Sequence, residues 1–232
     1  MGFSRPLAID LFCGLGGWAE GFLAEGYDCI GFDIERHDYG TGGYPGWLML
    51  QDVLTLHGSQ FKDAVVIVAS PPCQAYSYRA MPWRRAKALP PPDNSLFDAC
   101  FRIQREACEA AGHHIPLIVE NVRGAQKWVG RAAWNFGSYY LWGDVPALMP
   151  LTFRAQKFNP DGTRRPSGSW FKIADSKNRG QKNARNWWSG SAGSLSATTS
   201  SHSADRKRAS AIIAKIPFPL ARHIARVFKP YT

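Results

Sequence analysis

The chain has 232 residues, 45% of them hydrophobic, which is enough to bury one core with at most a small appendage. Its apolar runs fall far short of the roughly 20 residues that span a bilayer, and no apolar leader follows the N-terminus. These features exclude a membrane protein and predict a cytoplasmic one, while the net charge of +10 favours a polyanionic partner, with nucleic acid the leading candidate.

The first two-thirds of the chain alternates short apolar segments with helical patterns. We expect strands within residues 7–14, 28–35, 63–71 and 115–122, and helices within 17–26 and 94–111, the last capped by Asn94 or Ser95. Continuous apolar strands separated by helices predict an α/β fold, in which helices cover both faces of a mostly parallel sheet.

The pattern changes after about residue 144. Residues 150–210 contain 12 Lys and Arg against 3 Asp, with Trp170, Trp187 and Trp188 interleaved, whereas the rest of the chain has 16 basic and 15 acidic residues. This segment is either a nucleic-acid footprint or a solvated region that only aids solubility. A helical pattern returns over 205–228, interrupted by Pro217 and Pro219, so we divide the chain into 1–149, 150–205 and 206–232.

A glycine-rich stretch, "DLFCGLGGWAE", lies between the first strand and the first helix. Gly14, Gly16 and Gly17 fit the G-x-G-x-x-G/A form, in which glycines let the backbone approach a ligand at a helix N-terminus. Asp33 ends the second strand, where an acidic side chain could hold ribose hydroxyls. The pattern suits a dinucleotide, S-adenosylmethionine or a purely structural turn.

A single cysteine stands in "VASPPCQAYS", at the end of the apolar strand 63–71. Pro71 and Pro72 stiffen the chain before Cys73, so the residue is either a positioned reactive thiol or a buried structural cysteine. The five cysteines include no C-x-x-C pair, and we therefore expect neither a disulfide framework nor a metal site.

The strand "LIVENVRG" carries Glu120 and Asn121 to the same sheet edge as the cysteine. A carboxyl group there could pair with a base edge or act as a general acid. The alternative is a strand-end cap or an ion pair with Arg123.

In this order the three motifs resemble those of the cytosine-5 DNA methyltransferases. The likeness covers about residues 7–124 and 217–225: "NSLFDACFRI" is similar to the helix start after the catalytic loop, "QDV" at 51–53 to a third cofactor-binding strand, and "IPFPLARHIA" to the closing motif. The resemblance implies a Rossmann-like S-adenosylmethionine-dependent methyltransferase fold over 1–149, a reduced target-recognition region over 150–205, and a C-terminal helical segment, 206–232, that packs back on the catalytic domain.

The resemblance also implies the chemistry. Cys73 would attack carbon 6 of a flipped cytosine, and Glu120 would hydrogen-bond the ring, with Pro72 and Asn121 as the other implied catalytic residues. The cofactor would be S-adenosylmethionine, converted to S-adenosylhomocysteine, with Asp33 on the ribose and Asp52 on the adenine amino group. The implied cofactor-binding residues are Asp10, Phe12, Gly14, Leu15, Gly16, Gly17, Asp33, Ile34, Asp52, Val53, Pro72 and Leu96.

The implied partner is double-stranded DNA, bound by a monomer with no nuclease in the chain. We expect DNA contacts from Ser77 and from arginines near the cysteine and in the basic segment, namely Arg79, Arg84, Arg85, Arg123, Arg164 and Arg165. A solitary, phage-type or restriction–modification enzyme with a short or relaxed target site would fit this small recognition region.

Two departures from the family pattern concern the last third of the chain. The Gln-x-Arg-x-Arg run is not recognisable, which leaves Arg154, Arg164 and Arg165 as candidates for its arginine. The Gly-Asn pair of the closing motif reads Ile213-Ala214.

Three other functions remain open from the sequence. An RNA cytosine-5 methyltransferase, such as one acting on tRNA, would keep Cys73 and Glu120 and differ in substrate. A catalytically inactive DNA-binding relative would explain the altered last third. A nicotinamide-dependent dehydrogenase shares the glycine turn but leaves the other motifs unexplained.

Overall fold

The computed structural model describes residues 5–40, 42–76, 90–150, 207–208, 211–212 and 214–230. In chain order these residues form β1 (Leu7–Leu11), α1 (Gly17–Ala24), β2 (Asp28–Asp33), β3 (Trp47–Leu50), the 3₁₀ turns η1 (Val53–Thr55) and η2 (Gly58–Phe61), β4 (Val66–Ala69), η3 (Gln74–Tyr76), α3 (Ser95–Ala111), β5 (Leu117–Asn121), η5 (Arg123–Ala125), α4 (Gln126–Val129), β6 (Trp134–Phe136), β7 (Tyr139–Gly143) and α8 (Phe218–Val227). None of the helices in these ranges is long and apolar enough to cross a membrane.

The strands form one twisted sheet in the order β3-β2-β1-β4-β5-β7-β6. The first five strands in this order are parallel, and β7 pairs antiparallel with both β5 and β6. Every residue of β1, β4 and β5 is buried, which explains why apolar and polar residues do not alternate along these strands. The predicted α/β sheet is thereby confirmed.

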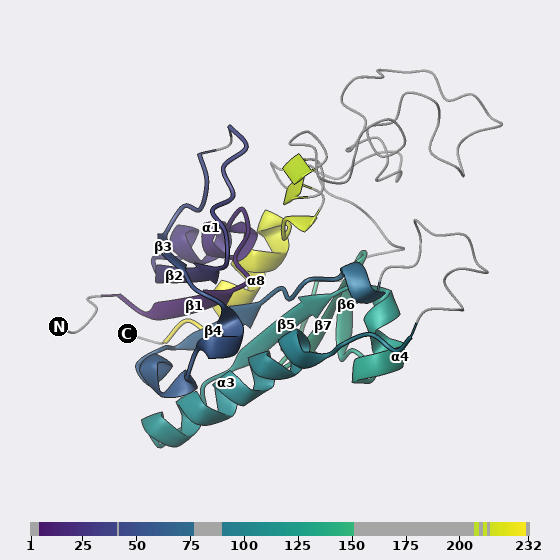
Figure 1. Ribbon diagram of the computed structural model, residues 1–232. Coiled ribbons are helices and arrows are strands. Elements are labelled where there is room, and N and C mark those ends of the chain that lie inside the picture. Colours follow the sequence, from purple (N-terminus) through teal and green to yellow (C-terminus); the bar gives the residue numbers. More distant parts are fainter. Residues whose placement is uncertain are drawn as a thin grey trace.

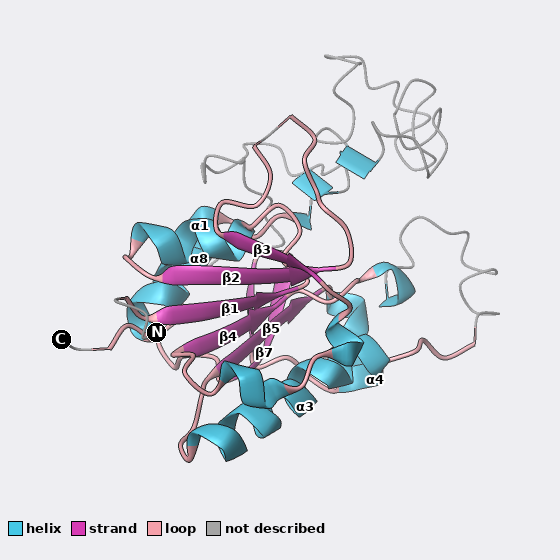
Figure 2. Cartoon of the chain, turned by 60° about the vertical axis from the view of Figure 1, so that its left-hand side comes forward, coloured by secondary structure: helices cyan, strands magenta, loops and turns pink. Residues whose placement is uncertain are grey.

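Helices cover the two faces of this sheet (Figures 1 and 2). Alternate residues of β4 belong to two different hydrophobic cores: Val66 and Val68 pack on the side of α1 and α8, whereas Ile67 and Ala69 pack on the side of α3. Because β4 lies at the centre of the sheet, its carboxyl end is held from both layers.

The prolines near the C-terminus interrupt a helical stretch, as predicted, and they open its second part: residues 207–208, 211–212 and 214 are helical, and helix α8 begins at Phe218. Pro217 is the N-cap of α8 and Pro219 lies in its first turn, where a missing N–H has no helical partner to lose. Helix α8 lies against α1: a Cβ added at Gly21 would come 2.5 Å from the Cβ of Ala221, and the Tyr27 hydroxyl donates to the Ala225 carbonyl at 2.9 Å. The first helix is therefore fixed by a segment about 200 residues later in the chain.

The hairpin of β6 and β7 was not predicted from the sequence. Gly137 has a φ of 61°, and with Ser138 it forms the two-residue connection between the strands. Strand β7 pairs with the end of β5, with Leu141 opposite Glu120 and Tyr140 opposite Asn121. The hairpin thus supports the strand that carries two of the predicted site residues.

Candidate active site

The carboxyl ends of β1, β2, β4 and β5 bring the three motifs to one edge of the sheet. Leu11 at the end of β1 pairs with Phe32 of β2 and Ala69 of β4, and Ala69 pairs with Val119 of β5. After β1 the chain turns to α1 on one face, and after β4 it continues to α3 on the other (Figure 1). Open α/β sheets bind ligands at such a divergence.

The glycine loop, residues 12–16, has a backbone that few residue types can adopt. Phe12 is the one described non-glycine residue with positive φ (57°), and Gly14 and Gly16 have φ of 50° and 72°. A Cβ at Gly16 would lie against the Pro45 ring, whereas a Cβ at Gly14 would meet nothing within 4 Å. Open space therefore borders the loop at Gly14.

Asp33 links this loop to the end of β2. Its Oδ2 accepts a hydrogen bond from Gly14 N–H at 3.0 Å, and its Oδ1 lies 3.5 Å from His37 Nε2. Burial by itself would raise the pKa of Asp33, but the hydrogen bonds from His37 and Gly14 outweigh it, so the pKa lies below its ordinary value. The carboxylate is thus held ionised at neutral pH, beside the open space at Gly14.

Asp10, beneath the glycine loop, is 2% exposed, and neither carboxylate oxygen has a hydrogen-bond partner among the described residues. Burial raises the pKa of Asp10 well above its ordinary value. The Tyr44 hydroxyl and the Ala19 backbone N–H are near enough to lower this pKa in part, yet both lie outside hydrogen-bond geometry. A buried carboxyl group without a partner fits a bound ligand that supplies a donor or a positive charge.

Apolar side chains border the edge beside these carboxylates. Ile34 is 73% exposed and Leu54 45% exposed, although both are large aliphatic residues. Asp52 lies between β3 and η1, where its Oδ1 accepts from Leu54 N–H at 2.9 Å. The expected third strand over 51–53 is therefore wrong in its bounds, because β3 ends at Leu50 and Asp52 caps the turn after it.

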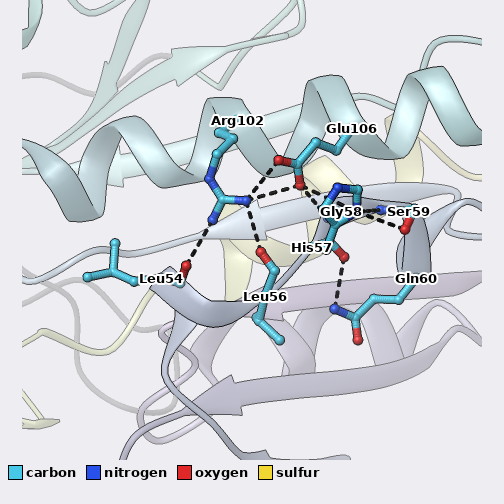
Figure 3. Close-up of polar contacts among 8 residues, drawn as sticks. All are labelled: Leu54, Leu56, His57, Gly58, Ser59, Gln60, Arg102 and Glu106. Atoms are coloured by element: carbon cyan, nitrogen blue, oxygen red, sulfur yellow. Dashed lines mark hydrogen bonds and ion pairs between the residues drawn. The ribbon is translucent and has the colours of Figure 1, made fainter.

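An ionic cluster on α3 holds this turn in place (Figure 3). Arg102 donates to the carbonyls of Leu56 at 2.9 Å and Leu54 at 3.3 Å, and it also binds Glu106 at 2.9 Å. Glu106 Oε2 in turn accepts from Gly58 N–H at 2.6 Å. The segment with Asp52 is therefore fixed to the helix whose first turn carries Leu96.

The cysteine loop, residues 70–76, follows β4. Asn121, 1% exposed at the end of β5, donates from Nδ2 to the Pro71 carbonyl at 2.9 Å. On the other side of Cys73, Tyr76 donates from its backbone N–H to the Cys73 carbonyl at 3.0 Å and from its hydroxyl to Asn94 at 2.9 Å. The loop is therefore anchored on both sides of a cysteine that is partly exposed.

Glu120 lies beside this loop at the end of β5 and is 8% exposed. Since β4 and β5 are adjacent and parallel, Glu120 near the end of β5 lies at the same edge of the sheet as the loop of Cys73, which follows β4. The arrangement places a partly exposed thiol and a buried carboxyl group at the same edge as the glycine loop. A thiol can add to an electrophilic ring, and a carboxyl group can hydrogen-bond that ring.

The structure places the remaining predicted site residues as follows. Leu15 and Val53 are buried. Arg123 is exposed at the start of η5. The next residue, Gly124, packs against the cysteine loop, because a Cβ added there would clash with the Tyr76 carbonyl. Ser77, Arg79, Arg84, Arg85, Arg154, Arg164 and Arg165 lie outside the described residues.

Sequence reasoning missed His37, Arg102 and the anchoring role of Asn121. His37 stands four positions after Asp33, but the loop after β2 is not helical, so the i,i+4 spacing of helical pairs gave no local signal for this contact. Arg102 and Glu106 carry the i,i+4 signal of a helical ion pair, but their contacts with residues 54–58 are tertiary.

Three methyltransferases of known structure are similar to parts of this chain. A protein described as a prophage-encoded DNA modification methyltransferase from E. coli is 24% identical over 53% of this chain and 34% of that one, with a TM-score of 0.38. Dnmt2 of S. pombe is 19% identical over 53% and 36% (TM-score 0.37), and EhMeth of Entamoeba histolytica is 14% identical over 76% and 62% (TM-score 0.43). The chain thus spans 34% to 62% of the length of these proteins.

A comparison with curated protein sequences found no match. The family described as C-5 cytosine-specific DNA methylase does match, over residues 7–130, which is more than half of the 232 residues and includes the glycine loop, the cysteine loop and Glu120. The chain therefore belongs to the C-5 cytosine-specific DNA methylase family.

Proposed function

We propose that the protein methylates carbon 5 of cytosine in double-stranded DNA through a covalent intermediate on Cys73. One observation carries the proposal: Cys73 follows β4, Glu120 lies near the end of the adjacent parallel strand β5, and Asn121, the last residue of β5, is hydrogen-bonded to the loop that contains the thiol. Family membership supports the reaction class. The substrate and the covalent step are inferences from the residues at this edge.

S-adenosylmethionine is the methyl donor of this family, and it supplies an electrophilic methyl group when bound. The residues at the glycine loop fit it. Asp33 is ionised and faces the loop, open space adjoins Gly14, Asp10 has two unpartnered oxygens, and Ile34 offers an exposed apolar surface. In the proposal Asp33 accepts from ribose hydroxyls, Asp52 from the adenine amino group, and Ile34 contacts the base.

The chemistry assigned to this chain begins with the thiolate of Cys73. Its sulfur forms a bond to carbon 6 of the cytosine ring, and the electron pair displaced from the ring double bond makes carbon 5 nucleophilic. Glu120 hydrogen-bonds ring nitrogen 3 and the exocyclic amine, which stabilises the charge that develops as sulfur adds. After carbon 5 is methylated, a base removes its proton and the sulfur–carbon bond breaks, which restores both the ring double bond and the thiolate.

Carbon 6 is not accessible in a stacked duplex, so the target cytosine has to leave the helix, at a cost of about a few kcal/mol. The basic residues of 150–210, together with Ser77, Arg79, Arg84, Arg85 and Arg123, are the proposed phosphate contacts. A small recognition region makes few base contacts, and we therefore propose a short or relaxed target site.

The test incubates the protein with radiolabelled S-adenosylmethionine and unmethylated duplex DNA, with RNA in a parallel reaction. We expect label on carbon 5 of cytosine in DNA and none with Cys73→Ser. Cys108→Ser is the matched control, because Cys108 is also partly exposed but lies on α3, and it should retain activity. Label in RNA and not in DNA would change the substrate, and transfer by Cys73→Ser at the wild-type rate would refute the nucleophile.

A further inference from the structure

A tryptophan joins the two loops of the site. Trp18 is the second residue of α1, directly after the glycine loop, and it is 1% exposed. Its indole Nε1–H donates a hydrogen bond to the Ser70 hydroxyl at 3.0 Å. Ser70 is the first residue after β4 and begins the cysteine loop. The two residues are 52 positions apart in the sequence, so the bond is a tertiary link between the loops.

The donor side of this bond is rigid. A Cβ added at Gly17 would lie 2.5 Å from the backbone nitrogen of Ile216, and Lys215 forms an ion pair with Glu20 one turn later in α1. Trp18 packs in the core shared by α1 and α8, among side chains that include Phe22 and Leu220. The indole therefore cannot follow Ser70 if the cysteine loop moves.

The acceptor side has few other contacts before the cysteine. Ser70 continues the sheet ladder by donating its N–H to the Leu11 carbonyl at 3.1 Å, and Asn121 binds the Pro71 carbonyl. Asn121 ties the loop to β5, on the side of Glu120. Among these contacts, the hydrogen bond from Trp18 connects the cysteine loop to α1, the helix that follows the glycine loop, through two side chains.

We propose that Trp18 is a positioning residue that sets the place of the Cys73 loop relative to the glycine loop. The proposal rests on the proposed function, since thiolate addition and methyl transfer then occur on the same cytosine ring. Carbon 5 and carbon 6 are neighbours, so the loop that presents the thiol and the loop that presents the methyl group need a fixed separation. A misplacement of about 1 Å can lower a rate by about 100-fold.

The competing explanation is that Trp18 is an ordinary core residue whose N–H happens to find an acceptor. Both explanations predict that loss of the bond lowers stability, and stability alone therefore does not separate them. Two measurements do separate them: the alkylation rate of the Cys73 thiol, and kcat compared with the affinity for S-adenosylmethionine. A purely structural tryptophan would leave the alkylation rate and kcat unchanged in the folded protein.

The experiment compares Trp18→Phe, Ser70→Ala, the double variant and Ser70→Thr with the wild type. Alkylation of Cys73 by iodoacetamide, followed by peptide mass spectrometry, reports the loop without DNA or cofactor. We expect the alkylation rate to rise about fivefold in Trp18→Phe and Ser70→Ala, since a loop with one hydrogen bond fewer opens more often. We expect kcat for DNA methylation to fall about tenfold or more while S-adenosylmethionine affinity changes less than about twofold.

Trp142→Phe is the matched control. It also removes one indole hydrogen bond, from Nε1 to the Gly130 carbonyl at 2.9 Å, in a residue that is 6% exposed on β7. It should leave Cys73 alkylation and kcat at wild-type values, and Ser70→Thr, which keeps the hydroxyl, should restore both. The double variant should be no worse than either single variant, because both changes remove the same bond.

Three results would overturn the proposal: Trp18→Phe that behaves like Trp142→Phe, additive losses in the double variant, or a loss of cofactor affinity as large as the loss of kcat. If the wild type transfers no methyl group to DNA, the proposed function fails. The alkylation rates still decide whether Trp18 positions the loop.

Discussion

Asn121 Nδ2 donates to the carbonyl oxygen of Pro71 at 2.9 Å, and Asn121 Oδ1 accepts from the N–H of Val122 at 2.8 Å. One buried amide thus connects the end of β5 to the loop before Cys73. Asn121→Ala should lower kcat by about 100-fold through misplacement of the thiol, and it should destabilise the fold by about 2 kcal/mol. Cofactor affinity, measured by titration calorimetry, should stay at the wild-type value.

Asn135→Ala is the control for this variant. Asn135 also donates its amide to a backbone carbonyl, that of Gly137 at 3.1 Å, but it lies on β6, away from the cysteine loop. Its kcat should match the wild type. An Asn121→Ala protein with wild-type kcat would show that Asn121 does not position the loop.

The pair of His37 and Asp33 should make stability depend on pH. The hydrogen bond to Asp33 raises the pKa of His37 above its ordinary value of 6.5, despite the opposing effect of burial, and the pKa of Asp33 lies below 3.8. The pair is therefore most stabilising between these ordinary values, is lost as the pH rises through the raised pKa of His37, and is lost again as it falls through the pKa of Asp33.

His37→Ala tests this dependence by urea unfolding. The wild type should exceed the variant by about 1 kcal/mol near pH 5 and by less near pH 8.5. Glu35, 3.9 Å from His37, and Tyr39, 3.2 Å from it, also face the imidazole, and Lys207 lowers its pKa in part. A stability difference that stays constant with pH would mean that the pair does not titrate as the contacts require.

Much of the fold could be predicted because its signals are local. The apolar runs of β1, β4 and β5, the glycine loop and the helix that begins at Ser95 all follow from short segments. The hairpin of β6 and β7 could not, because its strands are short and mix polar and aromatic residues. It forms through pairing with β5, a contact that local propensity does not report.

The candidate site divides in the same way. Motif residues such as Gly14, Asp33 and Cys73 are recognisable from their neighbours in the chain. The residues that hold them are not, since Trp18 and Ser70 are 52 positions apart and Asn121 and Pro71 are 50. Such partners become neighbours only when parallel strands align their carboxyl ends.

Arg102 and Glu106 should matter to both stability and cofactor binding. Burial by itself would raise the pKa of Glu106, but Gly58 N–H and Arg102 outweigh it, so the pKa is lowered and the pair is ionised at neutral pH. Arg102→Met should cost about 1–3 kcal/mol, because the carbonyls of Leu54 and Leu56 lose their donor. It should also weaken S-adenosylmethionine binding, since the turn that follows Asp52 loosens.

Thermal unfolding and calorimetric titration measure these two effects. Arg105→Met is the control: it removes an exposed arginine from the same helix and should change stability by less than about 0.5 kcal/mol. Equal cofactor affinity in Arg102→Met and Arg105→Met would limit Arg102 to a role in folding.

We expect Asp10 to lower the stability of the free protein and to strengthen the binding of S-adenosylmethionine. Burial raises the pKa of its carboxyl group, and the charge of Asp33 adds to this effect. Because the pKa of Asp10 in the folded protein lies above the ordinary 3.8, the contribution of Asp10 to stability is fully present below pH 3.8. This contribution is lost as the pH rises through the folded pKa. Asp10→Asn has no such loss, so its Tm should equal or exceed that of the wild type at neutral pH.

The same substitution should weaken S-adenosylmethionine binding by about tenfold, because one acceptor oxygen of a buried carboxyl group is replaced by an NH2 group that can only donate. Asp63→Asn, an exposed carboxylate after η2, should change neither Tm nor affinity. The two expected effects of Asp10→Asn have opposite signs, which a general disturbance of the core cannot produce. A lower Tm with unchanged affinity would instead assign Asp10 to folding, with its partner supplied by solvent.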